Sequence, residues 1–153
     1  MEESGGFSMF MGEFKHALDE KKRLIIPSKY RDGLGSTFIM TRGIDKCLFL
    51  YSEKEWNCLT AKLHTLSFTK KDSRAFLRFF LSGATILEVD KQGRINIPNQ
   101  HLEYAGISKD CMIVGVGERL EIWSKDAWDA FYMENKDELS NMAEHLFDGI
   151  KED

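Results

Sequence analysis

The feature that most constrains the fold is a ten-residue stretch, residues 18–27, which occurs again at residues 89–98. Both copies read apolar, Asp, three mostly polar residues, Arg, apolar, any residue, Ile, Pro. The similarity continues backward to Gly12 and Gly83 and, after a one-residue insertion, forward to Trp56 and Trp128. About forty-five residues are therefore duplicated. Because only two copies exist, the pattern predicts an internal pseudo-dimer and not a long solenoid.

The loop between the Asp and the Arg has a physical interpretation. Three residues flanked by apolar runs are typical of a tight connection between two strands, and Gly93 in the second copy accepts a positive φ at little cost. Asp19 with Arg23, and Asp90 with Arg94, are expected to pair across the loop and to fix its shape. An acid–base role for the two aspartates is the weaker interpretation, because each has an arginine four residues on.

The residues around each loop predict short strands and helices. Pro27 and Pro98 end the second strand of their copies, since proline cannot donate to a sheet but fits the first turn of a helix. Ser52 opens a capping box for a longer helix. Strands are expected at 14–18, 37–41, 47–51, 85–89, 94–97, 111–116 and 120–123, short helices at 28–32 and 99–104, a chain break at 33–35, and a helix from residue 125.

The predicted fold class is mainly β with helices (α+β), divided into five parts. Residues 75–81 include six apolar residues, so that we expect them to be buried in the link between the halves, with some area left for an oligomer. The parts are a disordered tail (1–8), a first repeat (9–56), a helical linker (57–82), a second repeat (83–128), and a C-terminal helix with an acidic tail (129–153).

Composition bounds the class of protein. At 153 residues, with 42% hydrophobic and 30% charged side chains, the chain is typical of a soluble globular protein with a real core. No apolar run approaches the roughly 20 residues of a membrane span. The three cysteines and four histidines lack the spacing of a disulfide framework, a metal site or a catalytic pair. We therefore expect a cytoplasmic protein without metal, cofactor or small-molecule substrate, and not an enzyme.

Charge is distributed unevenly along the chain. Residues 1–82 carry 14 basic and 10 acidic side chains, whereas residues 83–153 carry 7 and 15, so that a half of net +4 precedes one of net −8. The adjacent cations Lys21, Lys22 and Arg23 repel one another by up to about 1 kcal/mol per near pair, and an anion would stabilise them. A local basic patch of this kind permits nucleic-acid binding by an acidic chain.

The doubled Asp-x-x-x-Arg, the Ile-Pro after it and the Met-Phe-Met-Gly-Glu of residues 9–13 resemble the bacterial MraZ family. The resemblance covers residues 9–150. This family is similar to the AbrB/MazE-like swapped-hairpin superfamily. The resemblance implies two swapped-hairpin β units packed as an internal pseudo-dimer, several chains closed into a ring, and binding to double-stranded DNA with short direct repeats.

The resemblance also implies which residues act. Arg23 and Arg94 match the family arginines, and Asp19 and Asp90 match the aspartates, while Lys22 departs from the loop glycine that the second copy keeps. The predicted DNA contacts are Lys15, Lys21, Lys22, Arg23, Arg42, Lys91 and Arg94, and the structural residues of the motif are Asp19, Asp90, Pro27 and Pro98.

The predicted function is that of a sequence-specific, nucleoid-associated transcriptional regulator, by resemblance a repressor acting on promoter repeats of the division and cell-wall gene cluster. The alternative is a protein-interaction module on the same fold, either an antitoxin-like partner binder or a scaffold ring. The acidic C-terminal segment could serve such a partner-binding role, although solvation alone also explains it.

Overall fold

The computed structural model describes residues 9–148, which form an α+β fold with antiparallel sheets. The expected tail at 1–8 and the end of the acidic segment, 149–153, lie outside the described residues. The elements are β1 (Phe10–Ala17), β2 (Arg23–Ile25), α1 (Ser28–Leu34), β3 (Thr37–Arg42), β4 (Leu48–Ser52), α2 (Glu53–Leu63), α3 (Lys71–Ser82), β5 (Thr85–Glu88), β6 (Arg94–Asn96), α4 (Asn99–Ala105), β7 (Asp110–Gly117), β8 (Leu120–Ser124), α5 (Lys125–Asn135), a 3-10 turn η1 (Lys136–Glu138) and α6 (Leu139–Phe147).

The two repeats exchange strands. The main sheet has the order β1-β7-β8-β4-β3-β5, and β2 pairs with β6 in a separate two-stranded ribbon. Exchanging each first-repeat strand with its second-repeat counterpart (β1 with β5, β3 with β7, β4 with β8) gives the same order, read from the other edge of the sheet. β1 pairs with β7, β5 with β3 and β2 with β6, so that these strands find their partners in the other repeat. Neither repeat can therefore form its sheet without the other.

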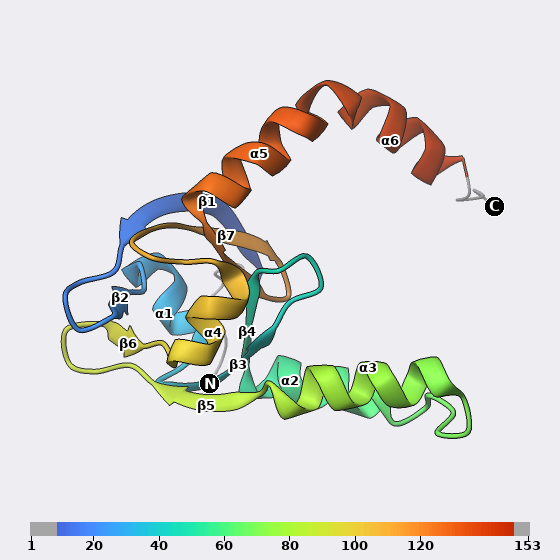
Figure 1. Cartoon of the computed structure of the whole chain (residues 1–153), viewed down its shortest axis with the longest axis horizontal. Coiled ribbons are helices and arrows are strands. Elements are labelled where there is room, and N and C mark those ends of the chain that lie inside the picture. The colour runs from blue at the N-terminus through green and yellow to red at the C-terminus, as the bar shows by residue number, and fades with distance from the viewer. Residues whose placement is uncertain (1–8, 149–153) are drawn as a thin grey trace, which may run out of the picture.

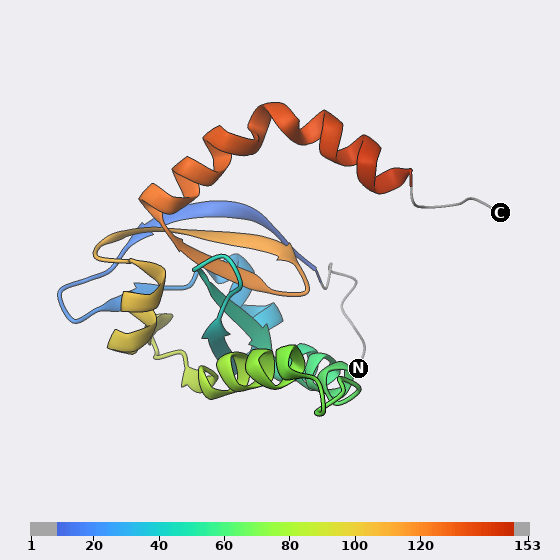
Figure 2. The same cartoon turned by 45° about the vertical axis from the view of Figure 1, so that its right-hand side comes forward.

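Two apolar clusters lie on opposite faces of the main sheet. The larger fills the space between the sheet, the β2–β6 ribbon and the short helices α1 and α4, and includes the fully buried Leu24, Phe38 and Ile122. The second lies under α2, α3 and α5 and includes Phe49 and Trp123. Figures 1 and 2 show the ribbon and the short helices on one side of the sheet and the longer helices on the other. The ribbon is thus held against the core on one face only.

The sequence predicted the helix starts correctly and one break incorrectly. The Ser52 Oγ accepts a hydrogen bond from the Glu55 N–H (3.2 Å), as expected of a capping residue. Pro27 and Pro98 each precede a short helix, at the N-cap position and not within its first turn. The chain break expected at 33–35 begins only at Gly35, because α1 continues through Leu34, which packs in the core.

The longer helices leave apolar surface exposed. α2 and α3 lie side by side (Figures 1 and 2), and the Trp56 ring stacks on Phe80 at 5.8 Å between centroids. Of the apolar run at 75–81 only Phe80 is buried, while Phe79 and Leu81 are 39% and 42% exposed. The expectation that the link between the halves buries this run was therefore wrong for most of it, because α3 packs through one face alone. None of the described helices is long and apolar enough to cross a membrane.

Candidate nucleic-acid interface

Each motif loop is closed by its own aspartate. The Asp19 Oδ1 accepts hydrogen bonds from the backbone N–H groups of Lys21 (2.8 Å) and Arg23 (2.9 Å), and Oδ2 accepts from the Arg23 Nε (2.7 Å). In the second loop Asp90 accepts from Gln92, Arg94 and the Arg94 Nε in the same way, at 2.8–2.9 Å. The predicted ion pairs are confirmed, and they orient both arginines.

The loop hydrogen bonds also hold both carboxylates in the charged form. A hydrogen bond from the Arg23 backbone N–H is the largest influence that lowers the pKa of Asp19 below its ordinary value. The Arg94 backbone N–H does the same to the pKa of Asp90. Because each carboxylate stays ionised, its arginine remains paired through Nε at neutral pH.

The two loops share one conformation despite the Lys22/Gly93 difference. Lys22 has φ 63° and Gly93 has φ 81°, both in the left-handed region. Each donates its N–H to the carbonyl of the loop aspartate at 3.0 Å. A side chain at Gly93 would overlap the Arg31 guanidinium, whereas Lys22 borders an open pocket beside Leu102 in α4. A side chain at residue 93 would therefore have to displace the Arg31 guanidinium, whereas Lys22 displaces nothing comparable.

The ribbon presents both arginines on one outward face. Arg23 lies opposite Asn96, Leu24 opposite Ile95, and Ile25 opposite Arg94. Leu24 and Ile95 are buried, and because side chains alternate along a strand the other four point away from the core. Each loop is also tied to the other repeat, since the Ile26 N–H donates to the Gly93 carbonyl at 2.9 Å and the Ile97 N–H donates to the Lys22 carbonyl at 3.4 Å. The ribbon and its loops therefore form one surface.

The two halves of the chain match one protein family. Residues 9–79 and residues 80–150 each match the model described as "MraZ protein, putative antitoxin-like". The chain belongs to the MraZ family. A protein named "Transcriptional regulator MraZ" from Ligilactobacillus salivarius (strain UCC118) is 53% identical over 140 residues, which cover 92% of this chain and 98% of that relative. The resemblance to the MraZ family is thereby confirmed, and this family is not one of enzymes.

Five of the seven predicted contact residues of this MraZ chain lie together. They are the loop and ribbon cations Lys21, Lys22, Arg23, Lys91 and Arg94. Lys15 does not join them: it lies opposite Met112, whose side chain belongs to the cluster on the far face of the main sheet. Arg42 does not join them either, because its Nη1 donates to the Phe79 carbonyl (3.0 Å) and its guanidinium carbon lies 4.9 Å from the Phe79 ring centroid.

Three further residues of the MraZ repeats lie at this surface and were not predicted from the sequence. Ile25 and Asn96 occupy the "any residue" position of the motif, and the period of two along the strand would have placed them beside the arginines. Arg31 lies against the second loop, with its Nε donating to the Ile26 carbonyl at 2.8 Å. No local sequence signal indicated Arg31, because its neighbour Gly93 comes from the other repeat.

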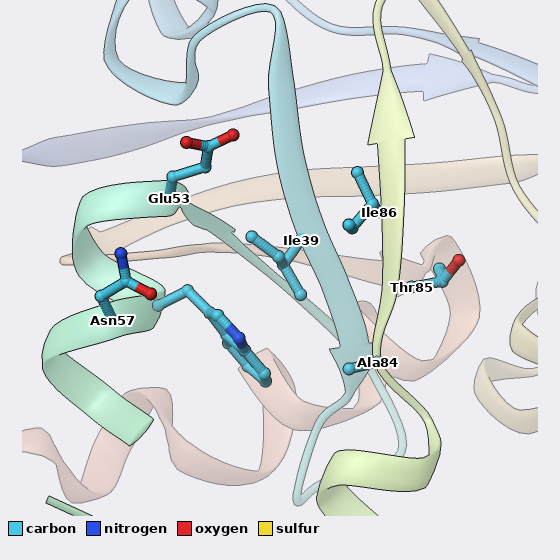
Figure 3. A pocket seen from close by; sticks show the side chains of 7 residues that line it. Ile39, Glu53, Asn57, Ala84, Thr85 and Ile86 are labelled. Carbon is cyan, nitrogen blue, oxygen red and sulfur yellow. The ribbon is translucent and has the colours of Figure 1, made fainter. Parts of the chain in front are cut away.

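The pocket in Figure 3 offers few groups that could take part in catalysis. It has a volume of about 590 Å³ and lies between α2 and β5, and Glu53 is the one carboxylate among its lining residues, which also include Trp56. Burial raises the pKa of Cys47 to about 12 and that of Cys111 to about 11, so that neither thiol is a nucleophile at neutral pH. Residues 9–148 contain no group of three or more His, Cys, Asp or Glu side chains that could hold a metal ion.

Proposed function

We propose that the chain is a sequence-specific DNA-binding transcriptional regulator that reads DNA through the β2–β6 ribbon. The observation that carries the proposal is the pair of outward arginines, each oriented by its own aspartate on a two-stranded ribbon. The name of the relative, a transcriptional regulator, supports it. By family resemblance we propose that it represses promoters of the division and cell-wall gene cluster, in the cytoplasm and at the nucleoid.

The ribbon has the dimensions that the major groove requires. That groove is about 12 Å wide and admits a two-stranded β-ribbon, whose strands are about 4.8 Å apart. The Arg23 ion pair uses Nε, which leaves the two terminal amino groups outside that pair for O6 and N7 of a guanine. One terminal amino group of Arg94 also donates to the Gln92 Oε1 (3.1 Å). We therefore infer that Arg23 makes the stronger base contact.

Neighbouring cations would contact phosphates. Lys21, Lys22 and Lys91 are exposed on the loops that flank the ribbon. The net charge of the chain is −4, so that attraction to DNA has to come from such a local patch. Phosphate contacts position a protein on DNA without reading its sequence, whereas base contacts specify. We infer that the lysines supply affinity and the ribbon supplies selectivity.

The strand exchange supports the swapped-hairpin pseudo-dimer as the fold of this surface. β1 with β7 and β5 with β3 are equivalent pairings between the repeats, and the ribbon contributes one strand from each. On this proposal the ribbon lies on the pseudo-two-fold axis that relates the two repeats. A single repeat would then lack half of the reading surface.

Assembly into a ring of identical chains is the second part of the proposal. Residues 53–82, which include α2 and α3, carry a net charge of +3 and leave Phe79 and Leu81 exposed, whereas residues 125–148, with α5 and α6, carry −5 and leave Leu139 and Leu146 exposed. The two surfaces are complementary and different, and contacts of this kind join identical subunits head to tail into rings or filaments. Sedimentation at micromolar concentration should show a closed oligomer, and a stable monomer would contradict the proposal.

The alternative of a partner-binding or scaffold protein rests on the same acidic segment. α5 and α6 project from the body (Figures 1 and 2), and Phe131, Tyr132 and Met142 line a shallow apolar pocket on them. A tagged chain captured from lysate with and without nuclease would separate the two functions. Partners that survive nuclease treatment would favour the interaction module, whereas loss of all partners would favour DNA binding.

The main test compares the two arginines. We expect Arg23→Ala to abolish specific binding to a promoter fragment, because a bidentate guanine contact is worth about 1–3 kcal/mol and is repeated in every bound subunit. Arg94→Ala should weaken binding less. Lys54→Ala, an exposed cation on α2 beyond the far face of the sheet, is the matched control. Wild-type binding by a folded Arg23→Ala protein would show that the loop is only structural.

A further inference from the structure

The outward face of the ribbon is only half symmetric. Exchange of the two repeats replaces Arg23 with Arg94 and replaces Ile25 with Asn96. The arginines match, but an apolar side chain in the first repeat stands where the second has an amide. The ribbon therefore has two chemically different ends, although its backbone pairing is symmetric.

The register decides which residues share an end. Arg23 lies opposite Asn96, and Ile25 lies opposite Arg94. Opposed residues in an antiparallel pair have Cα atoms about 4.5–5.5 Å apart, whereas the two outward rows are separated by two residues, about 6.8 Å along the strand. One end thus combines a guanidinium with an amide, and the other combines a guanidinium with the branched apolar side chain of isoleucine.

Neither Ile25 nor Asn96 is required for the core. Asn96 is exposed, and Ile25 is 43% exposed although Leu24 and Ile26 on either side of it are fully buried. An isoleucine held in water next to an arginine contributes little to folding. Both side chains are therefore free to contact a ligand that covers the ribbon.

Major-groove chemistry assigns a base to each of these side chains. An asparagine amide pairs with two atoms of adenine, because its Nδ2 donates to N7 and its Oδ1 accepts from N6. An apolar side chain packs on the methyl group of thymine. Arginine pairs with O6 and N7 of guanine. The amide end is thus suited to guanine with adenine, and the apolar end to guanine with thymine.

We propose that Asn96 and Ile25 are specificity-determining residues that give the DNA site a direction. Asn96 recognises an adenine beside the guanine bound by Arg23, and Ile25 contacts a thymine methyl beside the guanine bound by Arg94. The proposal rests on the proposed function, DNA reading by the ribbon. A ribbon with identical ends would bind a given site equally well in either of its two orientations. This ribbon distinguishes them, so that copies lying side by side read sites that point the same way.

The first experiment selects duplexes from a random pool with the full-length chain and its variants. Asn96→Ala should lose the adenine preference, a change of about 5- to 150-fold at that base pair, which is the discrimination of a good bidentate contact. The thymine preference at the other end should remain. Asn57→Ala removes an exposed amide on α2 and should change no base preference.

Two further variants give new preferences, which a merely destabilised protein could not show. Asn96→Asp keeps the side-chain size but only accepts hydrogen bonds, and should replace the adenine preference with one for cytosine, whose N4 donates. Ile25→Asn gives both ends of the ribbon an amide. It should replace the thymine preference beside the second guanine with a preference for adenine.

The outcomes separate this proposal from the proposed function. If the wild-type chain selects no sequence at all, the proposed function fails. If the wild-type chain selects a sequence but Asn96→Ala, Asn96→Asp and Ile25→Asn change every base preference by less than about twofold, recognition by Asn96 and Ile25 is overturned while DNA binding stands. Circular dichroism of each variant, expected to match wild type, shows that the substitutions leave the fold intact.

Discussion

Replacing Gly93 with lysine would make the second loop identical to the first at its left-handed position, and we expect it to destabilise the fold. Gly93 has φ 81°, and a left-handed conformation costs a non-glycine residue roughly 1–2 kcal/mol. The new side chain would also displace the Arg31 guanidinium. Loss of its hydrogen bond to the Ile26 carbonyl (2.8 Å) costs roughly 1.5–3 kcal/mol more. The sum is a decrease of roughly 2.5–5 kcal/mol in the free energy of unfolding.

The measurement is urea denaturation followed by circular dichroism, and a double-mutant cycle separates the two contributions. The residue of α4 that corresponds to Arg31 is Leu102, so that Arg31→Leu places in α1 the same residue that α4 has at the equivalent position. Gly93→Lys in the Arg31→Leu background should cost only the conformational part, roughly 1–2 kcal/mol. Lys22→Gly is the matched control and should leave stability within about 1 kcal/mol of wild type, because relief of the left-handed strain is offset by the entropy of the unfolded glycine.

Strict additivity in this cycle would refute the reasoning, since it would mean that Arg31 and residue 93 do not interact. A Gly93→Lys protein as stable as wild type would refute it as well. Either result would leave the glycine of the second loop without a structural reason.

Three further outcomes are expected. The pKa values of Asp19 and Asp90 are lowered in the folded protein, so that the two carboxylates stabilise it fully above the unfolded pKa of about 3.9. This stabilisation is lost as the pH falls through the lower pKa of the folded state. Asp19→Asn should therefore reduce the free energy of unfolding at pH 7 but not at a pH below that folded-state pKa, and an equal reduction at both pH values in urea titrations would count against it. Affinity for DNA should fall steeply with salt, with a slope of log K against log salt of about −0.9 per phosphate contact, and Lys21→Ala with Lys22→Ala should flatten the slope with little change in sequence preference; an unchanged slope would remove these lysines from the phosphate contacts. A ring should bind direct repeats spaced by about one helical turn, roughly 10 bp, better than repeats shifted by half a turn; equal affinity for both arrays in a mobility-shift assay would exclude simultaneous binding by a rigid ring.

The sequence predicts the structure correctly where the deciding interactions are local. The Asp19–Arg23 and Asp90–Arg94 pairs join residues four apart, and Ser52 caps the helix that begins at the next residue. Such contacts depend on spacing along the chain, which the sequence displays directly. Spacing does not reveal contacts between distant segments, such as the one that binds the Arg42 side chain to Phe79 of α3.

The sequence by itself determined that two equivalent loops exist, that each orients an arginine by an ion pair, and that the chain is one member of a two-repeat family. The tertiary structure decided that strands of one repeat pair with strands of the other, and hence that Arg23 and Arg94 share a ribbon with Ile25 and Asn96. It also decided that a glycine at residue 93 leaves room for the Arg31 guanidinium, which approaches it from the other repeat. The physical reason is that strand pairing and core burial are set by which apolar faces meet across the whole chain, and spacing within either repeat contains no record of that choice.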